Sequence, residues 1–311
     1  MNEVTPEREW NEITYSSQDG LKLYARHYPA LSSDNSVPAR PVLCLAGLTR
    51  NSKDFHTVAV HLSKKSKTPR DVYCLDYRGR GKSAHDPNWQ NYSPYIELLD
   101  TLDFMTLSEL HHATIFGTSR GGIIAMLMGV VRPGVVGGAI LNDIGPVIEA
   151  RGLARIIGYV GKTPAPANWD EATLIARDMA ARFFTDVSDD EWLEIARQWY
   201  EEEDGLPVAG YDAALSNALA EIDLARPVPQ MWEQFNALTH VPMLVLRGEN
   251  SDLLSSETVQ KMADRHPHME HYLVEEEGHA PLLRDWRTLR VINKFLADAD
   301  AWDDTAKSEI G

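Results

Sequence analysis

Ser119 is the residue of this sequence that is best placed to act as a nucleophile. It lies in Gly117-Thr118-Ser119-Arg120-Gly121, which matches the pattern G-x-S-x-G. The pattern is short, but it directly follows an apolar, strand-like run at 113–116 and directly precedes a helical run at 122–131. A strand–turn–helix setting of this kind exposes a serine hydroxyl at a sharp turn and turns the first amides of the helix toward developing negative charge. A serine that only caps a helix would explain less of this context.

A serine hydroxyl needs a base, and the base needs an acid that orients it. We expect His279 to be the base, because it lies between the last predicted strand and the last predicted helix. For the acid we prefer Asp252, which follows the strand at 243–246. Asp143 follows another strand and is the alternative acid; otherwise we expect it to make hydrogen bonds within its loop. The carboxyl ends of parallel strands share one edge of a sheet, so Ser119, Asp252 and His279 are predicted to meet there.

Two other chemistries are suggested by short patterns and are set aside. Gly81-Lys82-Ser83 resembles the end of a phosphate-binding loop, but the glycine that this loop requires is replaced by Asp76. His266 and His268, with His271 nearby, lack a cysteine or acidic cluster at ligand spacing, so we expect solvated histidines and no metal site.

The elements that must position Ser119, Asp252 and His279 are short apolar strands alternating with helices. The run at 21–28 alternates with period two, which predicts an early antiparallel strand. The later runs are apolar on both faces, as in buried parallel strands. They are predicted at 42–46, 72–75, 113–116, 136–141, 243–246 and 272–274. This order predicts an α/β fold with a mostly parallel sheet flanked by helices.

Residues 146–236 interrupt the alternation. They contain helix signals, such as the capping box from Ser188 to Glu191, and no convincing strand. We therefore expect a core domain formed by 1–145 and 237–311, with a helical cap inserted at 146–236. Most of the cap aromatics are spaced as core residues; Trp192, Trp232 and Phe235 are our candidates for lining a substrate pocket.

Composition limits the partners and the compartment. The formal net charge is −16, which disfavours nucleic acid and anionic lipid as partners. The sequence has no long apolar run and no signal-peptide pattern at its start, so we expect a cytoplasmic protein without a membrane contact. Cys44 and Cys74 lie in strand-like runs and are expected to be free and buried. A monomer and a homodimer remain equally open.

Together these motifs resemble the α/β-hydrolase fold family, and within it the capped serine esterase-like branch, from about residue 10 to about residue 296. Leu45-Ala-Gly-Leu-Thr-Arg50 resembles the oxyanion loop of the family, although Ala46 stands where histidine is commonest. Asp76-Tyr-Arg-Gly-Arg-Gly-Lys-Ser83 resembles its D-x-R-G-x-G-x-S turn. The resemblance implies an eight-stranded sheet and an oxyanion hole formed by the backbone amides of Leu48 and Arg120. We expect the side chain of Arg120 to be structural.

The expected activity is cofactor-free hydrolysis, by way of an acyl-enzyme on Ser119, of carboxylic esters with small to medium apolar acyl groups. The partners are then a small ester and water, with no metal or organic cofactor. Serine at the turn argues against haloalkane dehalogenase and epoxide hydrolase chemistry, since those relatives use aspartate there. The alternatives are an enol-lactonase, a carbon–carbon bond hydrolase of aromatic degradation and, from another class, a non-catalytic small-molecule receptor.

Overall fold

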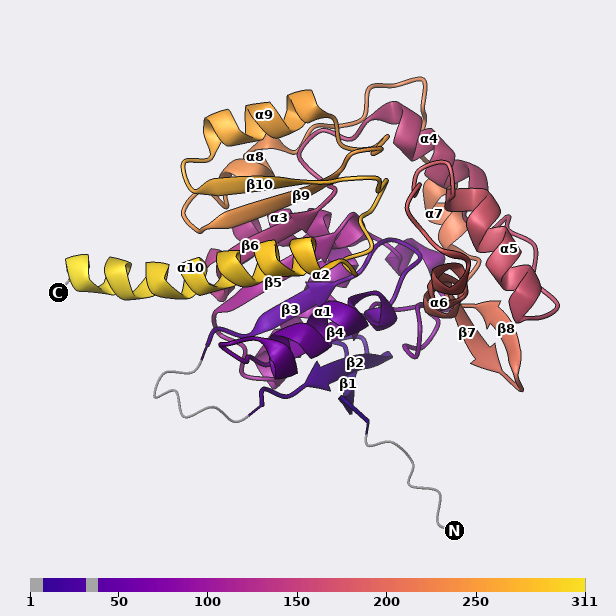
Figure 1. Cartoon of the computed structure of the whole chain (residues 1–311), viewed down its shortest axis with the longest axis horizontal. Helices are drawn as coiled ribbons and strands as arrows, with labels where there is room; N and C mark the ends of the chain where they lie inside the picture. Colours follow the sequence, from indigo (N-terminus) through magenta and orange to yellow (C-terminus); the bar gives the residue numbers. More distant parts are fainter. Residues whose placement is uncertain (1–7, 32–38, 311) are drawn as a thin grey trace, which may run out of the picture.

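A computed structural model describes residues 8–31 and 39–310 (Figure 1). Its centre is an eight-stranded sheet with the order β1-β2-β4-β3-β5-β6-β9-β10. β1 and β2 lie at one edge, where β1 pairs antiparallel with β2 and β2 pairs antiparallel with β4. The other six strands, β4, β3, β5, β6, β9 and β10, are parallel to one another. The strands are β1 (Asn11–Ser16), β2 (Lys22–Tyr28), β3 (Val42–Leu45), β4 (Val72–Asp76), β5 (Ala113–Thr118), β6 (Val136–Asn142), β9 (Met243–Gly248) and β10 (Met269–Val274).

The predicted architecture is confirmed: the sheet has eight strands, is mostly parallel and is flanked by helices. β1 was not predicted, because Ile13 and Tyr15 are the apolar residues of a six-residue strand and give too short an alternation. β10 begins three residues earlier than expected, at Met269, where polar and exposed residues obscured the pattern.

Helices cover both faces of the sheet (Figure 1). Successive strand residues point to opposite faces, so Leu43 and Leu45 pack on one side while Val42 and Cys44 pack on the other. The first face is covered by α2 (Pro94–Leu107), α3 (Arg120–Val131), α8 (Trp232–Asn236) and α9 (Ser256–Arg265). The second is covered by α1 (His56–Val60) and by the first half of α10 (Trp286–Ile310).

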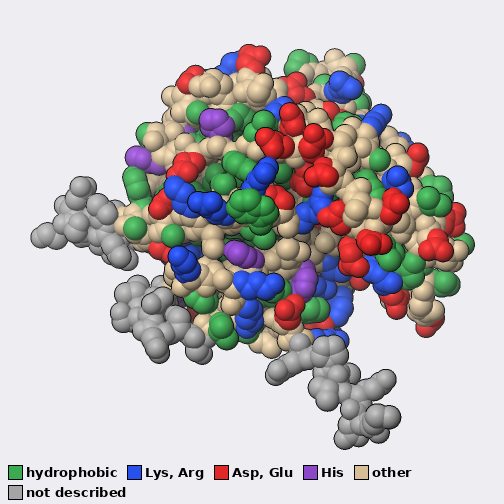
Figure 2. Space-filling view, in the orientation of Figure 1, with side chains coloured by type: hydrophobic (Ala, Val, Ile, Leu, Met, Phe, Trp, Pro, Cys, Tyr) green, Lys and Arg blue, Asp and Glu red, His purple; other side chains and the backbone are tan. Residues whose placement is uncertain are grey.

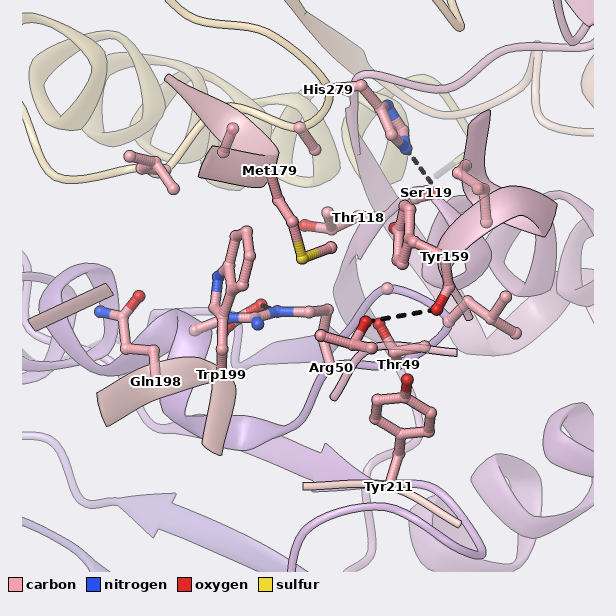
Figure 3. A pocket seen from close by; sticks show the side chains of 18 of the residues that line it. Thr49, Arg50, Thr118, Ser119, Tyr159, Met179, Gln198, Trp199, Tyr211 and His279 are labelled. Atoms are coloured by element: carbon pink, nitrogen blue, oxygen red, sulfur yellow. Dashed lines mark hydrogen bonds and ion pairs between the residues drawn. The ribbon is translucent and has the colours of Figure 1, made fainter. Parts of the chain in front are cut away.

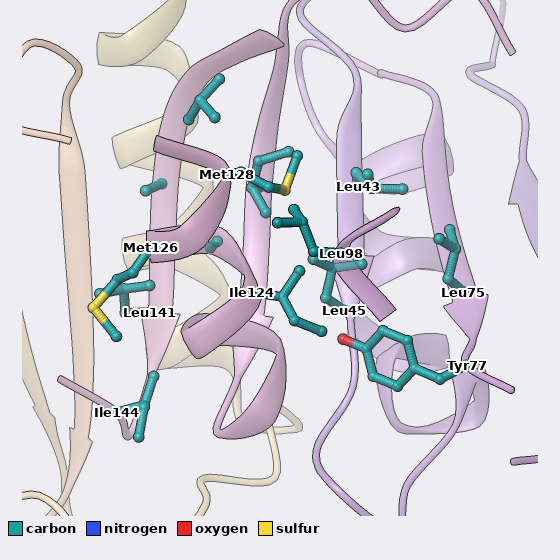
Figure 4. Packing of buried hydrophobic residues seen from close by; sticks show 14 of the residues in the cluster. Leu43, Leu45, Leu75, Tyr77, Leu98, Ile124, Met126, Met128, Leu141 and Ile144 are labelled. Carbon is teal, nitrogen blue, oxygen red and sulfur yellow. The ribbon is translucent and has the colours of Figure 1, made fainter. Parts of the chain in front are cut away.

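The helix that follows Ser119 is central to the first face. α3 lies across β3, β5 and β6, where Ile124 and Met128 pack among Leu45, Leu98 and Leu141 (Figure 4). Because both ends of the strand–turn–helix unit are held by buried packing, the turn between them has little freedom to move.

The chain between β6 and β9 contains α4 (Ala150–Tyr159), α5 (Trp169–Ala180), α6 (Asp189–Trp199) and α7 (Leu215–Ala220) before it reaches α8. It also contains a hairpin of β7 (Tyr200–Glu203) and β8 (Leu206–Ala209), which corrects the expectation of helices alone. The hairpin turns at Asp204-Gly205, both with positive φ (51° and 79°), as a two-residue hairpin turn requires. Its strands were missed because Glu201-Glu-Glu203 offers no apolar alternation.

Short helical turns complete the fold: η1 (Ser52–Phe55), η2 (His61–Lys65), η3 (Trp89–Asn91) and η4 (Pro133–Val135). Cys44 and Cys74 are free, buried neighbours in β3 and β4. Of the helices in the described ranges, none has the length and apolarity needed to cross a bilayer. In Figure 2, acidic side chains gather near the carboxyl end of β10 and around α6 and β7.

Candidate active site

Ser119 sits at a strained turn between β5 and α3. Its backbone has φ 50° and ψ −108°, a region that residues other than glycine rarely occupy and that costs about 1–3 kcal/mol. Its side chain makes no capping hydrogen bond to the helix that it precedes. The hydroxyl is therefore available for a partner outside the helix, unlike that of an ordinary N-cap serine.

Two glycines allow this turn to form. A Cβ at Gly117 would overlap the backbone of Gly121, and a Cβ at Gly121 would overlap the carbonyl group of Leu45. The two positions therefore need glycine because the backbone of α3 comes so close to β3 and β5.

The hydroxyl of Ser119 meets His279, as the sequence predicted. Ser119 Oγ lies 3.0 Å from His279 Nε2, and the other ring nitrogen, Nδ1, lies 2.8 Å from Asp143 Oδ2 (Figure 3 shows the first contact). The three residues come from the ends of β5 and β6 and from the loop between β10 and α10. Nucleophile, base and acid therefore form one hydrogen-bonded chain, in the geometry of a serine triad.

Asp143 is completely buried, and its carboxylate is fixed by three donors. Oδ1 accepts from the amide of Gly248 at 2.9 Å, and Oδ2 accepts from the hydroxyl of Ser251 at 2.5 Å as well as from His279. The backbone of Asp143 has a positive φ of 55°. A carboxyl group held in this way can keep the imidazole of His279 in one orientation.

The preference for Asp252 as the acid is corrected by this geometry. Arg155 of α4 holds both oxygens of Asp252, with Nε and Nη2 each at 2.7 Å. Burial alone would raise the pKa of Asp252, but the hydrogen bonds and charge of Arg155 outweigh it and lower that pKa. Both aspartates follow strands at the same edge of the sheet. The sequence could not show which of the two carboxylates would pair with an arginine of α4.

The predicted oxyanion loop passes directly beside Ser119. A Cβ placed on Gly47 would lie 3.9 Å from the Cβ of Ser119. Within the part of the chain that the structure describes, the amides of Leu48 and Arg120 donate to no other protein group. Two free N–H groups beside the nucleophile can bind an oxyanion.

A cavity of about 240 Å³ opens over Ser119 and His279. The core contributes Gly47–Arg50, Thr118 and Pro281–Leu283, and the chain between β6 and β9 contributes most of the rest. Figure 3 shows Tyr159, Met179 and Trp199 around the same space as Ser119. Burial raises the pKa of Tyr159, so its phenol stays protonated. The wall is largely apolar and aromatic, which suits an apolar substrate group.

The predicted pocket residues Trp192, Trp232 and Phe235 lie elsewhere. Trp192 is buried behind the cavity wall with Ile195. Trp232 and Phe235 belong to α8, which packs against α3 on the body of the sheet. Aromatic spacing predicts that such side chains pack against the core but not which surface they face; Trp192 and Phe235 are buried, and Trp232 is partly buried.

The side chains that line the cavity in their place lie on apolar stripes of the helices. Met179 and Phe183 are part of one apolar stripe at and after the end of α5, and Trp199 shares a face of α6 with Trp192. A stripe alone does not distinguish a core face from a cavity wall, because both bury apolar surface.

The remaining candidates take structural positions. Arg120 Nε lies 3.6 Å from the buried carboxylate of Glu97, in line with a structural side chain. His266 is buried and bonds the carbonyl oxygen of Leu238 at 3.1 Å, so it is not the solvated histidine expected. Over residues 8–31 and 39–310, no three His, Cys, Asp or Glu side chains are grouped so as to hold a metal ion.

Comparison with known proteins agrees with this architecture. The model of the Alpha/beta hydrolase family matches residues 42–289, a span that includes Ser119, Asp143 and His279. The 3-hydroxybutyrate-oligomer hydrolase of Cupriavidus necator is 29% identical over 276 residues, covering 84% of this chain and 90% of that protein.

Solved structures resemble the chain over nearly its whole length. An alpha/beta hydrolase from Novosphingobium aromaticivorans has 34% identity and a TM-score of 0.85, covering 94% of this chain and 99% of its own. An esterase from Exiguobacterium antarcticum has a TM-score of 0.67 and 17% identity, covering 93% and 98%, and shows a common fold alone.

Proposed function

The chain belongs to the alpha/beta hydrolase family, and from that premise we propose that it is a serine hydrolase acting on carboxylic esters with small to medium apolar acyl groups. The observation that carries the proposal is the hydrogen-bonded chain from Ser119 Oγ through His279 to the buried Asp143, at the floor of an apolar cavity. The name of the Cupriavidus necator relative, a hydrolase of an oligomeric hydroxyacid ester, supports ester substrates.

Ester cleavage proceeds in two halves at this site. Ser119 Oγ attacks the carbonyl carbon while His279 Nε2 takes the hydroxyl proton, and the amides of Leu48 and Arg120 stabilise the oxyanion. His279 then gives its proton to the departing alcohol, which leaves the acyl group on Ser119. A water molecule, deprotonated by His279, attacks the acyl-enzyme and releases the carboxylic acid. Asp143 keeps the histidine oriented throughout.

We also propose that the chain between β6 and β9, from about residue 146 to about residue 236, acts as the substrate-selecting cap. It supplies Tyr159, Met179, Phe183 and Trp199 to the cavity wall, while the core supplies the reacting groups. Specificity and chemistry are thereby assigned to different parts of the chain.

The test is release of p-nitrophenol from p-nitrophenyl esters by the wild type and by Ser119→Ala. For the wild type we expect an initial burst of p-nitrophenol equal to the enzyme concentration, followed by steady turnover. In Ser119→Ala we expect kcat to fall by at least about 10⁴-fold. A fluorophosphonate should add its mass to the wild type and not to Ser119→Ala. Equal turnover by the two proteins would contradict the mechanism.

A panel of acyl esters, lactones and ring-fission diketones then distinguishes the classes of hydrolase. Turnover of esters well above the other two supports the proposal. Preference for a lactone or a diketone would replace the ester with that substrate class, and binding without turnover of any of them would indicate a receptor.

A further inference from the structure

Three charged side chains lie buried beneath the turn that carries Ser119. The side chains of Arg80 and Glu97 are 0% exposed, and that of Arg120 is 11% exposed. Arg80 Nη1 lies 2.8 Å from Glu97 Oε1, and Arg120 Nε lies 3.6 Å from Glu97 Oε2. Glu97, in the first turn of α2, therefore stands between two guanidinium groups.

Arg80 also holds the oxyanion loop. Arg80 Nε donates to the carbonyl oxygen of Leu48 at 2.8 Å, and Nη1 donates to the carbonyl oxygen of Arg78 at 2.7 Å. One continuous set of contacts thus runs from Leu48 through Arg80 and Glu97 to Arg120. Its two ends are the residues whose amides form the proposed oxyanion hole.

The turn that carries Arg80 directs its side chain inward. Gly79 and Gly81, on either side of it, have φ values of 70° and 51°. A Cβ at Gly81 would overlap the carboxylate of Asp76, which accepts the amides of Ser52 at 2.7 Å and Lys82 at 2.9 Å. The turn is therefore fixed at both glycines.

Stability is a poor explanation for this cluster. Burying charges costs several kcal/mol per ion, and apolar residues of similar volume often stabilise a fold as well or better. Both Glu97 oxygens, Arg80 Nη2 and the hydroxyl of Tyr77 are buried without an aligned hydrogen bond to a described residue. A cluster with this cost is better explained by the positions that it imposes on its neighbours.

We propose that the Arg80–Glu97–Arg120 cluster is a positioning device that holds the two halves of the oxyanion hole at a fixed separation. This role rests on the proposed function. The oxyanion loop and the nucleophile turn are far apart in the sequence, yet their amides must converge on one oxygen atom. Hydrogen-bond donors stabilise a transition state best when they are already in place before charge develops.

The test compares Arg80→Lys with Arg78→Lys. Lysine keeps the charge beside Glu97 but cannot also supply the separate donor to the carbonyl oxygen of Leu48. Arg78 is a matched control on the same turn, because its side chain is also buried (1% exposed) but pairs with Asp19, Asp86 and Asp100 instead of with Glu97. Readouts are melting temperature, kcat and KM on p-nitrophenyl butyrate, and affinity for an alkylboronic acid, whose adduct with serine mimics the tetrahedral intermediate.

We expect Arg80→Lys to lower kcat about 10- to 100-fold with KM within threefold, and to weaken boronic acid binding by a similar factor, since one oxyanion donor alone contributes about 10²–10³. Arg78→Lys should lower the melting temperature and leave kcat within about threefold of wild type. Equal kcat losses in the two variants, or an Arg80→Lys variant that binds boronic acid as the wild type does, would overturn the proposal.

Arg120→Met provides a second route if Arg80→Lys does not fold, because the partly exposed side chain of Arg120 is replaced while its amide is kept. It should lower kcat about 3- to 10-fold, and Arg120→Lys should restore most of that loss; no loss would contradict the role. A wild type that neither hydrolyses the ester nor binds boronic acid would instead refute the proposed function, and this role with it.

Discussion

At the scale of single residues, Asp143 and Asp252 are two carboxylates on the same sheet edge with different partners. Asp143 contacts His279 and is surrounded by the donors of Gly248 and Ser251. Asp252 is held by Arg155 through both oxygens and is not free to orient an imidazole. The partners of a carboxylate, more than its position after a strand, decide what it can do.

The substitutions Asp143→Asn and Asp252→Asn should therefore differ greatly in activity. An amide at position 143 can donate to His279 Nδ1 and favour the wrong tautomer, so we expect kcat to fall by about 10⁴-fold. The kcat of Asp252→Asn should stay within about tenfold of wild type, because Asp252 pairs with Arg155 and not with His279. Steady-state kinetics on p-nitrophenyl butyrate measures both. The reverse order of the two losses would return the role of acid to Asp252.

At the scale of elements, the loop between β10 and α10 places His279, and the neighbouring Glu277 is part of its support. Glu277 is buried, and its Oε2 accepts the amide of Leu282 at 2.7 Å, which closes the loop around the histidine. Burial, with smaller contributions from Asp285 and Asp186, raises the pKa of Glu277 from 4.5 to about 7. This carboxyl group therefore keeps its proton to a higher pH than a free glutamate does.

The raised pKa of Glu277 should make the folded protein less stable as the pH increases. Because the pKa of Glu277 is higher in the folded state, the stability linked to its proton is fully present below pH 4.5 and is lost as the pH rises through about 7. In the wild type, the free energy of unfolding should therefore decrease by up to roughly 3 kcal/mol between pH 4.5 and pH 7 through this group, and Glu277→Gln should remove that decrease. The free energy of unfolding is measured by urea denaturation at pH 4.5, 6 and 8.

Glu275→Gln is the matched control for this prediction, since Glu275 is exposed at the start of the same loop. Its pH dependence should follow that of the wild type. If Glu277→Gln kept the full slope, the buried carboxyl would not be the group that titrates.

At the scale of the whole molecule, a rigid sheet carries the reacting groups, and the segment from α4 to α7, with the hairpin of β7 and β8, lies at its carboxyl edge (Figure 1). Contacts to the body fasten it on both sides of the cavity. Arg155 pairs with Asp252 on one side, and Lys53 pairs with Glu201 of the hairpin at 2.8 Å on the other. Changes in the cavity wall can therefore alter which substrate enters without moving the triad.

Trp199→Ala should shift the enzyme toward longer acyl chains. The indole of Trp199 lines the cavity and lies over the guanidinium of Arg50, 4.9 Å from its centre. Removing it leaves room for several methylene groups, so the ratio of kcat/KM for p-nitrophenyl octanoate to that for the butyrate should rise about tenfold.

Trp192→Ala is the matched control, because Trp192 lies on the same helix but is buried behind the wall. It should cost about 3–5 kcal/mol of stability and leave the acyl preference unchanged. The same shift in both variants would indicate a general loosening of the chain over the cavity, and no shift in Trp199→Ala would place the acyl group elsewhere.

The sequence by itself determined most strands of the sheet, the turn at Ser119 and two of the three hydrogen-bonded groups, Ser119 and His279. Buried parallel strands are apolar on both faces, so their runs were visible, and the turn at Ser119 requires glycines that cannot be replaced without a clash. His279 followed from its place after the last strand. These features depend on neighbours along the chain, which a sequence displays directly.

Only the tertiary structure decided which carboxylate binds His279 and which aromatic side chains line the cavity. It also decided which side chains connect Leu48 with Arg120. Each depends on contacts between distant segments: Arg155 with Asp252, Trp199 rather than Trp192 at the cavity, and Arg80 with the carbonyl oxygen of Leu48. Local patterns predict that a side chain is buried or that it follows a strand. They do not specify the partner, because the partner is set by how the elements pack in three dimensions.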